Sequence, residues 1–218
     1  MAITMGPNGI IFSDNSNLEK YSTGLDTGQL VSVTTFTSSG TFTQPATANR
    51  VFVRVQGAGG GSAGYCESGG AGGYAEQLIE LAPNSTVTVT VGAGGAGVGY
   101  YAAAGNGGTS SFGSYCSATG GYGANQNLSH TGGAPGAGAG IVSLNGGSGT
   151  GHGNSMGSGG IGKGGAGYFG GSHGVRHYHG DKVGAGAPGS GASGAPASGL
   201  STTGTAASNG IVVVYAYT

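Results

Sequence analysis

Glycine occupies 55 of the 218 positions, and most of the glycines lie between two segments patterned as β-strands. From Gly57 to Gly210 the chain returns to glycine every few residues, as in Gly157-Ser-Gly-Gly-Ile-Gly-Lys-Gly-Gly-Ala-Gly167. It then closes on Ile211-Val-Val-Val-Tyr-Ala-Tyr217, which reads as a strand. Because a terminal strand has to pair with an earlier one, we expect the glycine region to be an insertion in a β-framework.

Composition argues against collagen and against disorder. Collagen needs glycine at every third position and abundant proline, whereas the triplet register breaks repeatedly here and only six prolines occur. Disordered chains combine low hydrophobicity with high net charge. This chain has a formal net charge of −1 and carries 11 Tyr and six Phe. We therefore expect an ordered, unusual structure.

Charge and hydropathy exclude two classes of partner. Nucleic-acid binding needs clustered basic residues, but the six basic residues are scattered along the chain. No apolar run approaches ~18 residues, so no membrane insertion is expected. The start, Met1-Ala-Ile-Thr-Met-Gly, lacks the basic and apolar parts of a secretory signal.

The two cysteines, Cys66 and Cys116, are compatible with one disulfide or with two thiols.

Alternating apolar residues predict an antiparallel framework over residues 31–56, 74–91 and 210–217. Val51, Val53 and Val55 share one face, and residues 86–91 alternate threonine with valine. No stretch has a helical period, so the fold class is all-β. Residues 1–30 differ from the rest and are read as a shaft-attachment or trimerisation segment, with an edge strand of the main domain as the alternative. Residues 31–218 form the main domain.

The glycine region from 92 to 209 is expected to form left-handed extended helices with three residues per turn. Short ladders such as Gly159, Gly162 and Gly165 would place glycine on one face of each helix and let neighbours approach closely. Backbone contacts then have to offset the large entropy cost of ordering glycine. A flexible linker of ~120 residues inside a β-domain would be unusual.

Four segments carry a family resemblance: Gly40-Thr-Phe-Thr-Gln-Pro, Val51-Phe-Val-Arg-Val-Gln-Gly-Ala-Gly-Gly-Gly61, Gly72-Gly-Tyr-Ala-Glu76 and Val87-Thr-Val-Thr-Val-Gly-Ala-Gly-Gly95. Roughly from residue 36 to 218, the chain resembles the glycine-rich domain at the distal end of bacteriophage tail fibres and their adhesins. A related layout occurs in the extracellular domain of anaplastic lymphoma kinase-type receptors. The resemblance implies a β-sandwich with an inserted bundle of polyglycine II helices. Gly9-Ile-Ile-Phe-Ser-Asp also resembles repeats of trimeric fibre shafts, which implies a homotrimer.

The one cluster of ligand-type side chains lies in Ser172-His-Gly-Val-Arg-His-Tyr-His-Gly-Asp181. His177-Tyr-His179 resembles the His-x-His motif of T-even-type fibre tips, in which three chains ligate an octahedral iron. Iron or another transition metal at His177 and His179 is one interpretation. The preferred one is a loop tip that contacts a receptor without a metal or cofactor.

No enzyme is predicted. Gly92-Ala-Gly-Gly-Ala-Gly97 superficially suggests a dinucleotide loop, but no helix pattern follows it. The seven acidic residues are scattered and give no paired carboxylates.

Tyrosine and histidine at interruptions of the glycine region are the predicted receptor-binding residues. A rigid scaffold that presents Tyr, Ser, Asn and His on loops uses the chemistry of antibody paratopes, and tyrosine rings also stack on sugars. The alternative is that several of these tyrosines are buried spacers. The predicted residues are Tyr100, Tyr101, Tyr122, Tyr168, His177, Tyr178 and His179.

The leading functional prediction is a distal tail fibre adhesin of the virion, which joins the fibre shaft and binds a bacterial surface glycan or outer-membrane protein. A structural or ice-binding glycine-rich protein is the second hypothesis. Irregular repeats with Tyr and His at the interruptions disfavour it. A cell-surface ligand or receptor module is the third, disfavoured by the absence of a signal sequence.

Overall fold

The described residues form an all-β structure, and they contain no helix. β1 (Ile3–Gly6) and β2 (Gly9–Phe12) make a separate two-stranded antiparallel sheet. All other strands described belong to two five-stranded antiparallel sheets. The computed structural model describes residues 3–6, 9–12, 28–64, 67–99, 102–125, 134, 136–151, 162–171, 186–194 and 203–218.

The first large sheet has the order β11-β6-β5-β12-β3, and the terminal strand lies inside it. β12 pairs with β5 on one side and with β3 on the other, so the terminal strand does return to the early framework. This confirms the expectation that the glycine region is inserted between paired strands. The strands are β3 (Leu30–Phe36), β5 (Arg50–Gln56), β6 (Tyr74–Glu80), β11 (Val142–Leu144) and β12 (Ile211–Tyr217).

The second large sheet has the order β10-β9-β8-β7-β4. Only β4 and β7 fall within the predicted framework. The hairpin β8–β9 lies within residues 92–209, where helices and loops were expected, and so do β10 and β11, which pair in different sheets. These strands have two or three residues each, too few to show an alternating pattern. The strands are β4 (Gly40–Thr43), β7 (Thr86–Thr90), β8 (Ser110–Phe112), β9 (Cys116–Ala118) and β10 (Gly138–Ala139).

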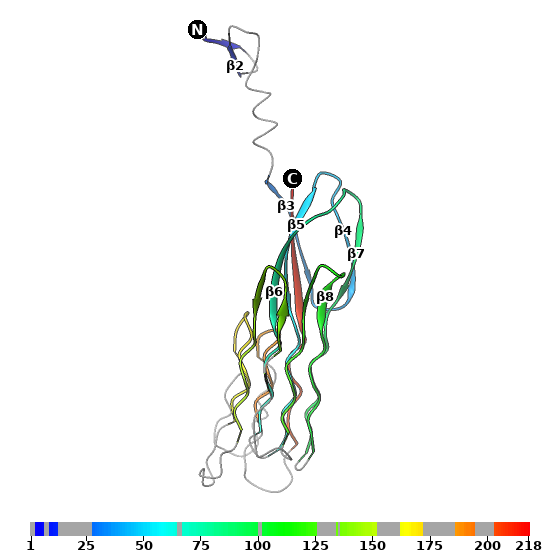
Figure 1. Cartoon of the computed structure of the whole chain (residues 1–218), viewed down its shortest axis with the longest axis vertical. Helices are drawn as coiled ribbons and strands as arrows, with labels where there is room; N and C mark the ends of the chain where they lie inside the picture. Colours follow the sequence, from blue (N-terminus) through cyan, green and yellow to red (C-terminus); the bar gives the residue numbers. More distant parts are fainter. Residues whose placement is uncertain are drawn as a thin grey trace.

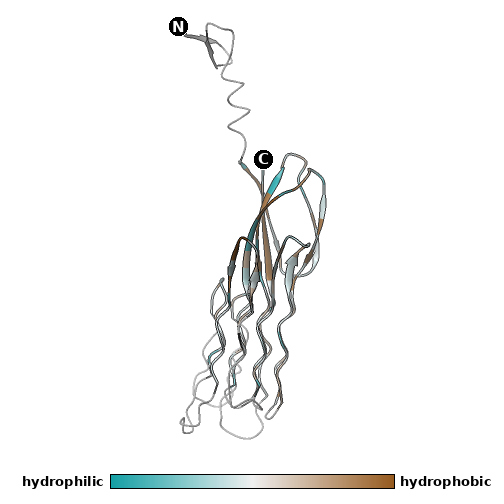
Figure 2. Cartoon of the chain, in the orientation of Figure 1, coloured by the Kyte–Doolittle hydropathy of each residue, from teal (hydrophilic) through white to brown (hydrophobic). Residues whose placement is uncertain are grey.

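The hydrophobic core lies between the two large sheets. Val51, Val53 and Val55 are fully buried, as their alternation predicts. They face a layer from the second sheet that includes Val89 and Phe112. Apolar residues accordingly concentrate on the strands and become sparse in the glycine-rich part (Figure 2). The turn at Pro83-Asn84 is also confirmed, and Asn84 has a φ of 62°, a conformation that asparagine tolerates.

Glycine-rich segments continue from the strand ends and run side by side away from the sheets (Figure 1). The segment from Gly57 to Gly64 shows how they are joined. Its N–H groups donate with a period of three: those of Gly57, Gly60 and Ala63 to residues 67–73, those of Ala58 and Gly61 to 102–109, and those of Gly59 and Ser62 to 203–210. Successive N–H groups of this segment therefore bond to three different neighbouring segments in rotation.

The same segment also accepts hydrogen bonds from three further neighbours. Gly95 and Val98 donate to its carbonyls from one segment, Gly121 and Ala124 from a second, and Ala192 from a third. The segment is thus enclosed by six others. Such contacts are close, because a β-carbon on Gly59 would lie 1.9 Å from the carbonyl oxygen of Ser190.

The two ends of the main domain lie together at the end of the sheets away from the glycine segments (Figure 1). Gly28 N–H donates to the carbonyl of Thr218 at 2.7 Å, and Thr218 N–H donates to Gln29 at 3.0 Å. At the opposite end, the carbonyl of Val98 accepts from both Gly64 and Gly204. In the described part of the chain, no helix is long and apolar enough to cross a membrane.

Candidate functional site

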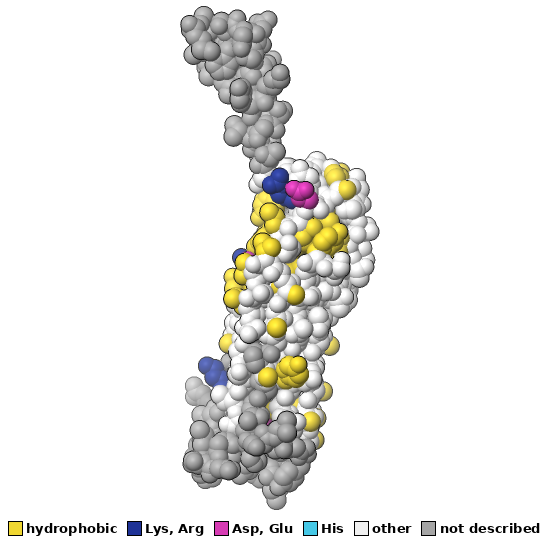
Figure 3. Space-filling model, viewed as in Figure 1, with side chains coloured by type: hydrophobic (Ala, Val, Ile, Leu, Met, Phe, Trp, Pro, Cys, Tyr) yellow, Lys and Arg dark blue, Asp and Glu magenta, His cyan; other side chains and the backbone are white. Residues whose placement is uncertain are grey.

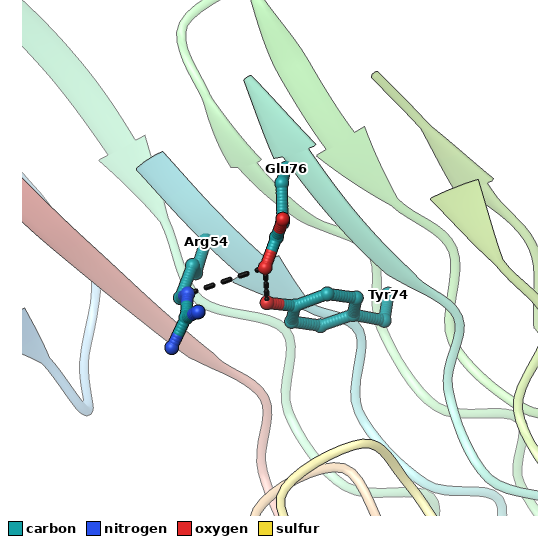
Figure 4. A network of polar contacts seen from close by, with 3 residues as sticks. All are labelled: Arg54, Tyr74 and Glu76. Atoms are coloured by element: carbon teal, nitrogen blue, oxygen red, sulfur yellow. Dashed lines mark hydrogen bonds and ion pairs between the residues drawn. The ribbon is translucent and has the colours of Figure 1, made fainter. Parts of the chain in front are cut away.

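A cluster of polar and aromatic side chains lies where the first large sheet meets the glycine segments. We call it the junction cluster: Arg54 on β5, Tyr74 and Glu76 on β6, and Tyr168 on the turn 167–170. Figure 4 shows Arg54, Tyr74 and Glu76 pointing toward one another from neighbouring strands. Arg54 lies directly opposite Glu76 in the strand register, and Tyr74 and Glu76 share a face because they are two residues apart.

Glu76 holds the polar part of the cluster together. The Arg54 Nε atom lies 3.2 Å from Glu76 Oε1, and the Tyr74 hydroxyl donates a hydrogen bond to the same oxygen. Burial and the bond to Glu76 raise the pKa of Tyr74, so its hydroxyl remains a donor. Burial acts to lower the pKa of Arg54, but Tyr74 and Glu76 outweigh it and the net pKa is raised. The guanidinium therefore stays charged.

Aromatic rings surround the guanidinium. Arg54 Cζ lies 5.6 Å from the ring centroid of Phe52, 5.7 Å from that of Tyr215 and 6.0 Å from that of Tyr168. Rings at these distances attract a cation through their electron-rich faces. The ring of Tyr168 stacks on that of Tyr74 at 3.7 Å between centroids and 10° between planes.

Gln56 fixes the turn that carries Tyr168. Its fully buried amide donates to the carbonyls of Gly72 at 2.8 Å and Gly73 at 3.1 Å, and accepts from Tyr168 N–H at 3.0 Å. Backbone bonds between Gly167 and Gly170 close the turn. The sheet thereby sets the position of an aromatic side chain 112 residues further along the chain.

The junction cluster is equipped for binding. Tyr168 is 49% exposed, so one ring is held against Tyr74 while still reaching solvent. A fixed ring beside a charged guanidinium can stack on a sugar or hold an acidic group. Among the described residues, no group of three or more His, Cys, Asp or Glu could hold a metal ion.

The structure describes two of the predicted receptor-binding residues. Tyr168 belongs to the junction cluster, beside the sheets. Tyr122 is 55% exposed on the glycine-rich segment that follows β9, and its carbonyl accepts from Gly70 N–H at 2.9 Å. The structure does not bring these two residues into one cluster. Tyr100, Tyr101, His177, Tyr178 and His179 lie outside the described residues, as does Cys66; Cys116 is a buried free thiol.

The sequence interpretation did not single out Arg54, Tyr74 or Glu76. A signal for Tyr74 and Glu76 was present, because both lie on the outward face of a predicted strand. The partner Tyr168 lies 94 residues beyond Tyr74, and no periodicity links the two positions.

These features define an all-β protein in which glycine-rich segments extend a two-sheet core. Residues 34–217 match the family described as "Glycine-rich domain". The chain belongs to this family, and the match includes both large sheets, apart from the first four residues of β3, and the segments between their strands. No curated protein matches the chain.

Proposed function

We propose that this protein is the distal adhesin of a bacteriophage tail fibre and binds a surface receptor, a glycan or an outer-membrane protein, on a bacterial host. One observation carries the proposal. A backbone hydrogen bond joins Gly28 and Thr218 at one end of the sheets, while the glycine segments extend from the other end. An attachment point and a presenting surface at opposite ends of a stiff body is the arrangement an adhesin needs.

The glycine segments would supply the stiffness as a bundle of polyglycine II helices. The support is the three-residue period of donors along 57–63 and the six neighbours around this segment. An extended helix with three residues per turn aims successive N–H groups in three directions. Glycine at the contacts allows Cα–H groups to approach carbonyls directly.

Receptor recognition is assigned to loop tips in residues 98–130 and 168–183. Glycine segments that pack through their backbones have few side chains with which to distinguish partners. Aromatic, imidazole and amide groups at the interruptions remain for this task. Tyr122 and Tyr168 are the exposed members within the described residues. Tyr100, Tyr101, His177, Tyr178 and His179 complete the proposed set.

The proposed assembly is a homotrimer in the virion, with residues 1–30 toward the fibre shaft and the glycine region distal. Neither catalysis nor a cofactor is part of the proposal. An iron or other transition metal bound by His177 and His179 is the alternative for the His-x-His motif.

Adsorption of the purified chain to a panel of bacterial strains tests the function. We expect binding to particular strains, and at least tenfold weaker binding for a His177→Ala/Tyr178→Ala variant or a Tyr100→Ala/Tyr101→Ala variant. Each lost anchor at the centre of a contact costs ~2 kcal/mol or more. A Thr88→Ala variant, changed at an exposed strand position, is the control. Folded double variants that bind as well as the parent would refute the site. A parent that binds no strain but shapes ice crystals would favour the ice-binding alternative.

A further inference from the structure

The outer faces of the two large sheets differ sharply in polarity. The outer face of the second sheet is lined with hydroxyl residues: Thr41 pairs with Thr88, Thr43 with Thr86 and Thr90 with Ser111. This is the usual pattern of an antiparallel sheet with one face in water. The outer face of the first sheet does not follow it.

On the first sheet a continuous apolar row crosses four strands. Val33, Tyr215, Phe52 and Leu78 are successive register partners on β3, β12, β5 and β6. Val33 and Leu78 face away from the core and are each 50% exposed, although both side chains are apolar. Leu30, Val142 and Leu144 are further exposed aliphatic residues on the strands of this sheet. In the space-filling view, hydrophobic side chains gather mainly on the half of the molecule that holds the sheets (Figure 3).

We call this surface the apolar face: the outward residues of β3, β12, β5, β6 and β11. An exposed apolar surface of this kind marks an interaction site. Exposed valine and leucine side chains suit a protein partner better than a sugar, which needs polar groups around each ring.

The charges of the apolar face form two columns of opposite sign. β5 contributes Arg50 and Arg54, and β6 contributes Glu80 and Glu76, which are their direct register partners. The positive column therefore lies beside a negative column of equal length, and the two columns cancel. A partner with one dominant sign of charge gains no net electrostatic attraction from such a surface. A partner surface that carries the same two columns does gain it, because each column can face the column of opposite sign.

We propose that the apolar face binds the apolar face of a second copy of this chain, with the two chains parallel. The two copies are related by a two-fold rotation about an axis that is parallel to the strands and lies in the contact, over the boundary between β5 and β6. This rotation lays the positive column of one copy over the negative column of the other. Arg50 and Arg54 then face Glu80 and Glu76 of the second copy, and the row from Val33 to Leu78 is covered. The inference goes beyond the proposed function. A two-fold contact of this kind makes a dimer in place of the proposed trimer, and it covers Arg54 and Glu76 of the junction cluster.

Cross-linking of mixed chains tests the contact. Two full-length chains, Arg50→Cys and Glu80→Cys, are prepared in a Cys66→Ser background and mixed. A thiol-specific cross-linker that spans about 10 Å, the usual spacing of packed sheets, is then added. Each chain contains one engineered thiol, so a covalent pair can form only between copies. We expect efficient heterodimer formation, and little for Glu80→Cys mixed with a Thr88→Cys chain, whose thiol lies on the other sheet.

A second substitution makes the test specific to the apolar face. Leu78→Lys in both chains should reduce the cross-linked fraction at least tenfold, because it places a cation in the centre of the contact. Thr88→Lys in both chains is the matched control and should leave the fraction unchanged. An absent cross-link, or one unaffected by Leu78→Lys in folded chains, overturns the proposal. Sedimentation of the parent chain distinguishes the contact proposed here from the trimer of the proposed function. A dimer supports the contact through the apolar face and contradicts the trimer. A monomer at 50 times the cross-linking concentration contradicts both. Adsorption to bacteria is scored separately, so loss of assembly and loss of receptor binding remain distinguishable.

Discussion

Gly60 faces the backbone carbonyl of Tyr122 with no space for a side chain. A β-carbon on Gly60 would lie 2.1 Å from the Tyr122 oxygen and 2.3 Å from its carbonyl carbon. The adjacent Gly59 and Gly61 meet carbonyls of other segments at similar distances. Three consecutive glycines thus contact three different neighbours, and the backbone itself forms the packing surface.

Gly60→Ala should lower the free energy of unfolding by about 3 kcal/mol. The added methyl group would have to displace backbone, and overpacking of this kind is costly. Gly99→Ala is the matched control, because nothing lies within 4 Å of a β-carbon there. Its effect should stay within about 0.5 kcal/mol of the parent. Urea denaturation of both variants measures the difference; equal stabilities would refute backbone packing at Gly60.

Gln56→Leu should also destabilise the protein by about 3 kcal/mol. The buried amide bonds the carbonyl of Gly72 and the N–H of Tyr168, and leucine would leave both without these bonds. Gln77→Leu is the control: its side-chain oxygen accepts from Ile141 N–H at an exposed site where water can replace it. Thermal unfolding followed by circular dichroism compares the two. If the Gln56→Leu variant unfolded at the same temperature as the Gln77→Leu control, Gln56 would not be what fixes the turn.

The β-framework could be predicted from sequence because its residues alternate. Val51, Val53 and Val55 are separated by larger or polar residues, and this period of two is the signature of a half-buried strand. β8 and β9 could not be predicted in this way. Their three-residue strands show no period, and their place is set by the pairing of β8 with β7 and of β9 with β8.

The junction cluster was predictable only in part. Tyr168 stood out as an aromatic residue in a glycine-rich context. Its contact with Tyr74 depends on the turn that Gln56 holds, which is a tertiary feature. The apolar face escaped prediction for a related reason: an alternating strand shows which residues share a face, but not which face becomes covered.

Cys116 should be unreactive in the folded protein. Burial raises the pKa of its thiol to about 11, so almost no thiolate forms near neutral pH. In a Cys66→Ser background we expect no labelling by a thiol reagent at pH 8 until the chain is unfolded, and then one label per chain. Because the unfolded thiol loses its proton at lower pH than the folded one, this group favours folding less as pH rises from about 9 to 11. Rapid labelling of the folded chain would contradict its burial.

The stack of Tyr168 on Tyr74 should contribute about 1 kcal/mol to stability, the size usual for aromatic pairs. Tyr168→Ala removes the ring and should lower the free energy of unfolding by that amount or more. Tyr168→Phe keeps the ring and should remain close to the parent, because the bond from Tyr168 to Gln56 uses the backbone N–H. A double-mutant cycle with Tyr74→Ala isolates the pair, since the second truncation should cost less once the first is made. Additive effects of the two alanine substitutions would show that the rings lie together without a mutual attraction that matters for folding. The exposed ring of Tyr168 would then be better explained by a role in binding.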